Sequence, residues 1–239
     1  TYLRYILGED FEYNDLPITV IAQDQIVFPV AAEGAAALPG AVGIPGWERW
    51  NDYGIGLLRK NQKGQMRQAE EAFSRVEELG RPDGPVNLAR VYLREGRVDD
   101  AAQALRRAAA FDPPAYPWLL TWFTGLVNKQ NGQLDDAIAN FRHLLNTDFD
   151  EARRREFDFG QDYRVINELA QTLFERAKAE RGTARREARD RLLAESQAWF
   201  EKTLRLDPEN ATAHYNLALI HTLRWVSCTP FGRAVVPEV

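Results

Sequence analysis

A repeated spacing of small and large apolar residues constrains the fold of this chain more than any other feature. Ala89 and Ala101 are twelve residues apart, as are Gly125 and Ala137, and Ala89 precedes Gly125 by 36 residues. Self-similarity at a fixed period of about 20–50 residues is typical of solenoids, in which each structural repeat packs on its neighbours. The spacing therefore predicts a stack of similar helical units.

The small residues have a defined role in the helix pairs that this spacing predicts. A small side chain in the first helix lets the second helix approach, and a large residue four positions after the small residue of the second helix fills the groove. The small residues of the predicted first helices are Gly54, Ala89, Gly125, Ala170 and Ala218, and the large residues of the second helices are Phe73, Leu105, Phe141 and Phe200.

Glycine and proline punctuate the predicted pairs. Gly64, Gly96 and Gly132 stand where a left-handed residue would end the first helix of a pair. Pro82, Pro113 and Pro208 are expected to begin the next helix, where a missing N–H costs little.

We predict three regions. Residues 1–46 form an N-terminal extended or β-hairpin segment and linker, because two strand-favouring runs, 18–21 and 26–30, precede a stretch rich in Gly and Pro. Residues 47–223 form the solenoid, and residues 224–239 an irregular tail. The predicted pairs are 47–79, 83–111, 117–146 and 162–180 with 188–206, followed by an incomplete fifth that begins at Ala211. The fourth pair is expected to extend about two turns beyond the others.

Composition limits the classes of function. The net charge of −5 argues against a general nucleic-acid binder, which usually has a basic footprint. The single cysteine, Cys228, excludes an internal disulfide, a thiolate zinc cage and a Cys-x-x-Cys-His haem attachment in this chain. No apolar run approaches the roughly 20 residues that span a bilayer. The sequence begins at Thr1, so we expect a processed chain or part of a longer protein.

The sequence contains no constellation typical of an enzyme. His214 and His221 are seven residues apart, without a third ligand nearby, so we predict no metal site. Gly54-Ile55-Gly56 lacks the third glycine of a dinucleotide fingerprint, and no phosphate-binding loop is present. We therefore predict a protein that is not an enzyme and that binds no cofactor in this chain.

The residues at these spacings resemble the tetratricopeptide repeat (TPR), whose pattern W-x2-L-G-x2-Y…A-x3-F…P is present in pieces along the chain. The resemblance implies an all-α, right-handed solenoid of helical hairpins, here with a short N-terminal extended or β segment. It also implies a scaffold that binds a partner protein or peptide in a concave groove lined by the first helices. The candidate groove residues are Asn51, Arg59, Asn87, Arg90, Arg94, Trp122, Lys129, Asn167, Gln171 and Tyr215.

These residue types suit the recognition of a peptide. An Asn side chain both donates to and accepts from an extended backbone, and Arg forks bind carboxylates. Trp122 is of the type that dominates interfaces. Some TPR proteins hold a C-terminal carboxylate with Asn, Lys and Arg, and Asn87, Arg90 and Lys129 match part of such a set. Alternatively, the groove is solvated, or filled by segments of the chain itself.

A narrower resemblance rests on four runs of sequence. Residues 49–58, 87–96, 125–132 and 167–177 are similar to the C-terminal TPR module of bacterial multihaem c-type cytochromes. This resemblance implies a periplasmic or extracellular protein that docks or assembles an electron-transfer complex, with haem on an upstream domain or a partner such as a c-type cytochrome. The alternatives are a cytoplasmic TPR adaptor or chaperone-like peptide binder and, more remotely, an enzyme.

Overall fold

The computed structural model describes residues 43–60 and 64–228, with side chains up to Arg224, and every regular element in these ranges is helical. The predicted β-hairpin at 18–30 and residues 229–239 of the predicted tail lie outside the described residues. Within the described ranges the all-α prediction is confirmed.

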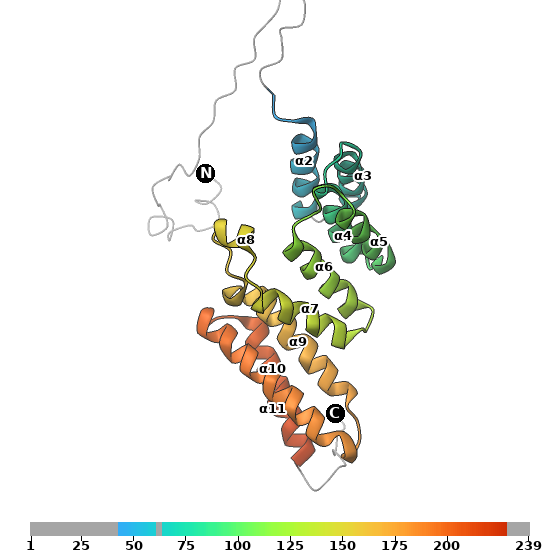
Figure 1. Ribbon diagram of the computed structural model, residues 1–239. Coiled ribbons are helices and arrows are strands. Elements are labelled where there is room, and N and C mark those ends of the chain that lie inside the picture. Colours follow the sequence, from blue (N-terminus) through green and yellow to red (C-terminus); the bar gives the residue numbers. More distant parts are fainter. Residues whose placement is uncertain (1–42, 61–63, 229–239) are drawn as a thin grey trace, which may run out of the picture. The chain divides into compact units, whose positions relative to one another are not determined.

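The helices follow one another as antiparallel pairs (Figure 1). Pair one comprises α2 (Gly46–Lys60) and α3 (Gln65–Glu78), pair two α4 (Asp83–Glu95) and α5 (Val98–Ala109), pair three α6 (Pro117–Gln130) and α7 (Leu134–Asn146), and pair four α9 (Tyr163–Ala179) and α10 (Arg186–Leu206), before the single helix α11 (Ala211–Cys228). Each first helix after α2 also contacts the second helix of the preceding pair. This arrangement is the helical-hairpin solenoid that the repeat predicts.

Close packing inside the pairs follows the small and large residues. A Cβ atom added to Gly54 would lie 2.6 Å from the ring of Phe73, and one added to Gly125 would lie 2.6 Å from the ring of Phe141. Both phenylalanines are fully buried. The predicted reason for glycine at these two positions is therefore confirmed: a side chain there would push the two helices of the pair apart.

Left-handed glycines end two of the first helices as predicted. Gly96 and Gly132 have φ values of +73° and +76°. The residue after each glycine donates its N–H to a carbonyl five residues earlier, from Arg97 to Tyr92 over 2.8 Å and from Gln133 to Asn128 over 2.8 Å. These bonds satisfy carbonyl groups that the helix itself leaves without partners.

The predicted role of proline is correct at one position and wrong at two. Pro82 is the N-cap of α4, as predicted. Pro113 instead lies in the α5–α6 loop, and Pro117 begins α6. Pro208 precedes the start of α11 by three residues, because the side chain of Asn210 accepts the N–H of Ala213 over 3.0 Å and so fixes where that helix begins.

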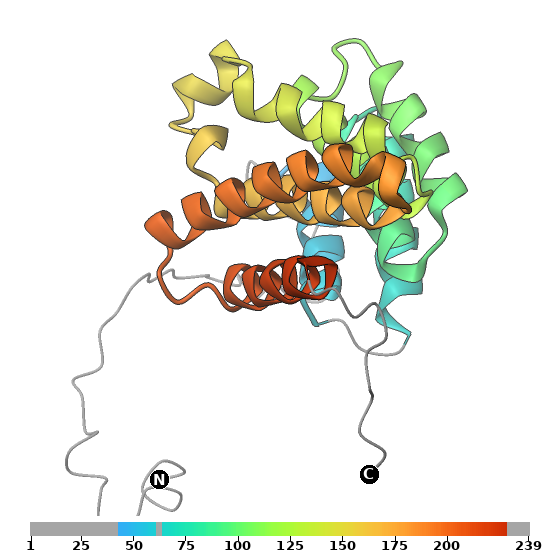
Figure 2. The same ribbon diagram turned by 90° about the horizontal axis from the view of Figure 1, so that it is seen from below.

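The C-terminal part departs from a uniform repeat. Short helices α8 (Asp150–Arg154) and η2 (Phe159–Gln161), which we did not predict, stand between pairs three and four. The long helices α9 and α10 run alongside one another, as Figure 2 shows, and confirm the predicted extension of pair four, with the turn η3 (Thr183–Arg185) between them. Helix α11 continues to Cys228, so the predicted end of the helical region at residue 223 was five residues too early.

The apolar core runs along the solenoid as a series of clusters. One fills pairs one and two and reaches α6, another joins α7 to α9, a third holds α9, α10 and α11 together, and a fourth lies beneath α8 and η2. Trp122 packs against three of the four clusters. The core thus links the pairs into a continuous scaffold with its first helices on one side.

Candidate partner-binding face

The candidate site is the first-helix face, formed by α2, α4, α6, α9 and α11. Neighbouring first helices touch directly at α2 with α4, α4 with α6 and α9 with α11. All ten predicted site residues lie on these helices. The polar groups of these residues differ in whether they already have partners within the chain.

At pair one and pair two, amide and guanidinium groups form a chain from α4 to α2. Arg90 Nη1 donates to Asn87 Oδ1 over 2.8 Å, and Asn87 Nδ2 donates to Asn51 Oδ1 over 2.8 Å. Asn87 is buried, so its amide joins the two helices. Burial of a polar side chain with its bonds satisfied fixes orientation, and here it holds Arg90 in place.

Three arginines meet beside this chain. Arg59 and Arg94 each stand five residues after the small residue of their helix, so the repeat places them at equivalent positions of α2 and α4. Arg94 Nη1 donates to the carbonyl of Leu58 over 2.5 Å, in the last turn of α2, where carbonyl groups lack helical partners. Burial lowers the pKa of Arg90, and the positive charges of Arg94 and Arg59 lower it further.

The cationic cluster of Arg59, Arg90 and Arg94 has no counter-charge among the described residues. Across residues 43–60 and 64–224, no carboxylate forms an ion pair with Arg59, Arg90 or Arg94, and Arg59 and Arg94 are exposed. Like charges held together without a counter-charge favour the binding of an anion, and guanidinium groups bind carboxylates with two parallel hydrogen bonds. At pairs one and two the first-helix face thus carries a positive charge that no described carboxylate neutralises.

Lys129 is differently engaged. Its Nζ lies 2.8 Å from Glu168 Oε2 and 3.1 Å from Gln171 Oε1, which joins α6 to α9. The ammonium charge is therefore neutralised within the chain. The partial carboxylate-binding set that we predicted divides in two: Asn87 and Arg90 belong to the cationic cluster, whereas Lys129 belongs to this ion pair.

Asn167 is buried between three helices. Its Nδ2 donates to Asn210 Oδ1 over 3.1 Å, and Thr203 Oγ1 donates to its Oδ1 over 2.9 Å. The same Asn210 oxygen caps α11 by accepting from Ala213. Both polar ends of the Asn167 amide thus have partners within the protein, and its observed contacts are structural.

The two predicted aromatic residues have opposite environments. Trp122 is half-buried and packs against Phe141, with ring centroids 5.7 Å apart, so it belongs to the core between the pairs. Tyr215 on α11 is 66% exposed. Of the two, only Tyr215 presents most of its ring to a partner.

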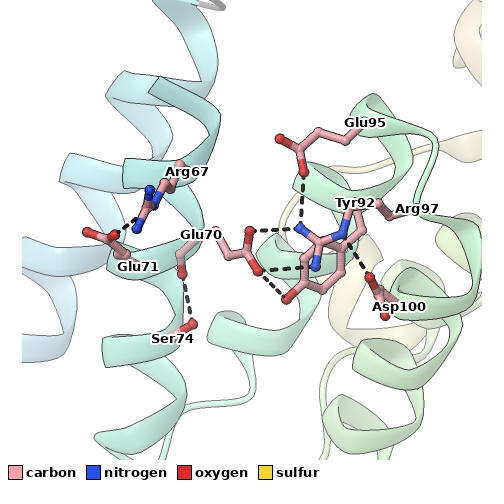
Figure 3. Close-up of polar contacts among 8 residues, drawn as sticks. All are labelled: Arg67, Glu70, Glu71, Ser74, Tyr92, Glu95, Arg97 and Asp100. Carbon is pink, nitrogen blue, oxygen red and sulfur yellow. Dashed lines mark hydrogen bonds and ion pairs between the residues drawn. The ribbon is translucent and has the colours of Figure 1, made fainter. Parts of the chain in front are cut away.

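A second charged cluster, centred on Arg97 and missed by sequence reasoning, lies at the same junction between pairs one and two (Figure 3). The guanidinium of Arg97 pairs with Glu70 at 2.8 Å, Asp100 at 2.8 Å and Glu95 at 3.2 Å, and it stacks 4.2 Å from the ring centroid of Tyr92. Tyr92 Oη donates to Glu70 Oε1 over 3.0 Å. Burial, followed by this hydrogen bond, raises the pKa of Tyr92 to about 12.

Two further properties bear on what the described residues can do. They include no group of three or more His, Cys, Asp or Glu side chains placed to hold a metal ion. Nor does any helix among them combine the length and apolar character needed to cross a membrane.

The comparison with known families agrees with the geometry. The family model of the tetratricopeptide repeat matches residues 62–116, a segment shorter than a quarter of the chain that contains α3, α4 and α5. No curated protein matches the sequence. Repeats of this family generally mediate protein–protein interaction, and folds of this type typically serve as non-catalytic scaffolds. Residues 62–116 therefore carry a tetratricopeptide repeat match, and the described helices form an all-α solenoid of that type.

Proposed function

We propose that this chain is a protein-interaction scaffold whose first-helix face holds a partner protein, and that Arg59, Arg90 and Arg94 receive an acidic segment of that partner. The observation that carries the proposal is the uncompensated charge of the three guanidinium groups. The chain has a net charge of −5. A local cationic site on an acidic protein favours a partner whose negative charge is confined to a short segment.

The geometry supports an extended partner segment over a small ligand. Arg90 of the cluster and Asn51 beside it are partly exposed, and Arg59 and Arg94 stand at equivalent positions of adjacent helices. An acidic segment that crosses from α2 to α4 would place successive carboxylates against successive guanidinium groups. Hydrogen bonds to charged groups contribute roughly 1.5–3 kcal/mol each, so loss of one arginine should weaken binding about tenfold or more.

A glutamate peptide with acetylated and amidated ends tests this proposal in fluorescence anisotropy. We expect the peptide to bind the full chain and to bind Arg90→Gln about tenfold more weakly. Arg106→Gln is the matched control, because Arg106 is an exposed arginine of α5, off the first-helix face, and its loss changes the net charge equally. Equal affinities of Arg90→Gln and the unsubstituted chain would contradict the assignment.

A version of the peptide with a free C-terminal carboxylate separates two modes of recognition. If the three arginines bind side-chain carboxylates, the free terminus adds little affinity. A gain that depends on Arg90 and Asn87 would instead assign the cluster to the end of the partner chain.

The nature of the partner is a finer proposal. The similarity of four sequence runs to the TPR module of multihaem c-type cytochromes supports a partner that carries haem, in a periplasmic or extracellular electron-transfer complex. With one cysteine, the chain itself holds no Cys-x-x-Cys-His motif. A visible spectrum and haem stain of the natively purified assembly test this proposal. The absence of a Soret band would favour the other candidate, a cytoplasmic adaptor or chaperone-like peptide binder.

A further inference from the structure

The outer face of pair one, formed by α2 and α3, exposes residues that are covered in the later pairs. Helices α4, α6 and α9 each pack on the second helix of the preceding pair. One position before the small residue of the first helix, Tyr53 is 51% exposed, whereas its equivalents Leu88 and Leu169 are 1% and 0% exposed. Four positions before the small residue, Trp50 is 43% exposed, whereas Ile166 is fully buried.

This face concentrates the apolar surface of the described residues. Eight large hydrophobic residues are exposed among the described residues, and four of them, Ile44, Trp50, Tyr53 and Leu79, lie in or beside pair one. Trp50 and Tyr53 already contact each other edge to face, with ring centroids 6.2 Å apart. Exposed Trp and Tyr side chains grouped in this way mark interaction surfaces.

A shallow groove runs between α2 and α3 beside these rings. Its volume is about 1240 Å³, and Trp50, Tyr53 and Ala72 contribute to its lining. Small-molecule sites usually measure roughly 300–1,000 Å³ and enclose most of their ligand. The size of the groove and its position at the end of the stack therefore fit a protein surface.

Charge identifies the occupant of this groove. Its lining contains three arginines and three glutamates, namely Arg49, Arg67, Arg75, Glu70, Glu71 and Glu78. The carboxylate of Glu70 is bound to Tyr92 and Arg97, which leaves Glu71 and Glu78, beside Arg67 and Arg75, as charges that can face a partner. A two-fold interface brings one patch against itself, so charges of the patch can pair across the interface only where the patch carries both signs. The pairs Arg67–Glu71 and Arg75–Glu78 are exposed and local, and such pairs exchange partners at little cost.

We propose that this aromatic face is a self-association surface, occupied by the same face of a second copy of this chain across a two-fold axis. Trp50 and Tyr53 of both copies form its apolar centre, and the Arg67–Glu71 and Arg75–Glu78 pairs form its rim. The scaffold then presents two first-helix faces, one from each copy.

Sedimentation equilibrium of the full chain across a wide range of protomer concentration tests the proposal. We expect a reversible dimer whose dissociation constant rises at least tenfold in Tyr53→Glu. The control is Tyr215→Glu, which places the same charge at a tyrosine on α11 that is even more exposed than Tyr53 and should leave the dimer unchanged. Circular dichroism establishes that both variants keep their helices. A chain that stays monomeric throughout overturns the proposal and assigns the face to another occupant.

A mixing experiment tests the two-fold arrangement itself. Tyr53→Glu and Tyr53→Lys should each be monomeric, because each places like charges against one another near the axis. An equimolar mixture of the two should form a heterodimer, since the charges then have opposite signs. Variants that dimerise separately as well as the unsubstituted chain does, or a mixture that remains monomeric, would overturn the arrangement.

Discussion

Two charged clusters lie at the junction between pairs one and two, and their arginines have opposite environments. Around Arg97, three carboxylates surround one guanidinium group (Figure 3). On the first-helix face, Arg59, Arg90 and Arg94 meet without an ion pair from any described carboxylate. The Arg97 cluster has its counter-charges within the chain, whereas the three arginines of the first-helix face have none among the described residues.

We therefore assign a structural role to the Arg97 cluster and propose a binding role for the arginines of the first-helix face. Glu70 belongs to α3, while Tyr92 and Arg97 belong to α4 and the turn after it, so that network holds two pairs together. Its hydrogen bonds to Glu70 and Asp100 raise the pKa of Arg97. On the first-helix face the effect has the opposite sign, because burial and neighbouring cations lower the pKa of Arg90. We expect an anion of the proposed partner to supply the counter-charge that the described residues do not.

The largest effect that we expect is on binding. Arg59→Glu should reduce the affinity for the capped glutamate peptide about a hundredfold, because it removes one cation of the cluster and neutralises another. Arg59 has no hydrogen bond or ion pair among the described residues, so the free energy of unfolding should change by less than about 0.5 kcal/mol. Peptide titration and urea unfolding measure the two quantities. An equal loss of affinity in Arg106→Glu would show that only net charge matters.

The next effect is on stability, in the other cluster. Glu70→Ala removes the acceptor of both Tyr92 and Arg97 and should lower the free energy of unfolding by about 1–3 kcal/mol in urea. Peptide affinity should remain unchanged. The matched control is Glu71→Ala, whose one ion pair, with Arg67, is exposed and should matter little. The comparison fails if both substitutions destabilise the chain equally.

A smaller effect concerns Tyr92, whose pKa is raised from 10.0 to about 12. A raised pKa means that the folded state binds this proton more tightly, so the contribution to stability is complete below pH 10 and is lost as the pH rises towards 12. Tyr92→Phe should lower the free energy of unfolding by about 1 kcal/mol at pH 8. It should also remove the latest step in the absorbance titration of the tyrosines at high pH. Persistence of that step in the variant would assign it to another tyrosine.

The smallest expected effect is on the stability of a variant in the cluster of the first-helix face. Arg90→Gln should change the free energy of unfolding by less than about 0.5 kcal/mol, because the lost bond to Asn87 is offset by relief of repulsion from Arg59 and Arg94. Urea unfolding at low ionic strength, where repulsion is least screened, gives the clearest value. Destabilisation well above 1 kcal/mol would make Arg90 a structural residue, comparable with Glu70.

Much of the fold follows from local spacing. The approach of Phe73 to Gly54, and of Phe141 to Gly125, could be predicted because the same spacing of a small and a large residue recurs in successive helical hairpins. The insertion of α8 and η2 could not, because its aromatic contacts, such as Trp118 with Phe149, belong to no repeat. The end of α11 was placed too early because we treated residues 224–228 as a break in the repeat pattern, although the backbone there remains helical.

The candidate site was predictable in part for the same reason. The repeat places Arg59 and Arg94 on adjacent helices at equivalent positions, so their proximity follows from the period. Glu168, which pairs with Lys129, lies 39 residues further along the chain, and Thr203, which donates to Asn167, lies 36 residues further. No local sequence pattern marks either partner. Nor does spacing reveal that Glu70 reaches Arg97, 27 residues away.

The arginine side-chain Nε–Hε signals test the contrast between the two clusters most directly. They are recorded by NMR during titration of the ¹⁵N-labelled full chain with the capped glutamate peptide, and assigned through the arginine substitutions. We expect the signals of Arg59, Arg90 and Arg94 to shift together and saturate, while that of Arg97 stays in place. Movement of Arg97 with the first-helix arginines unchanged, or no saturable shift at all, would contradict it.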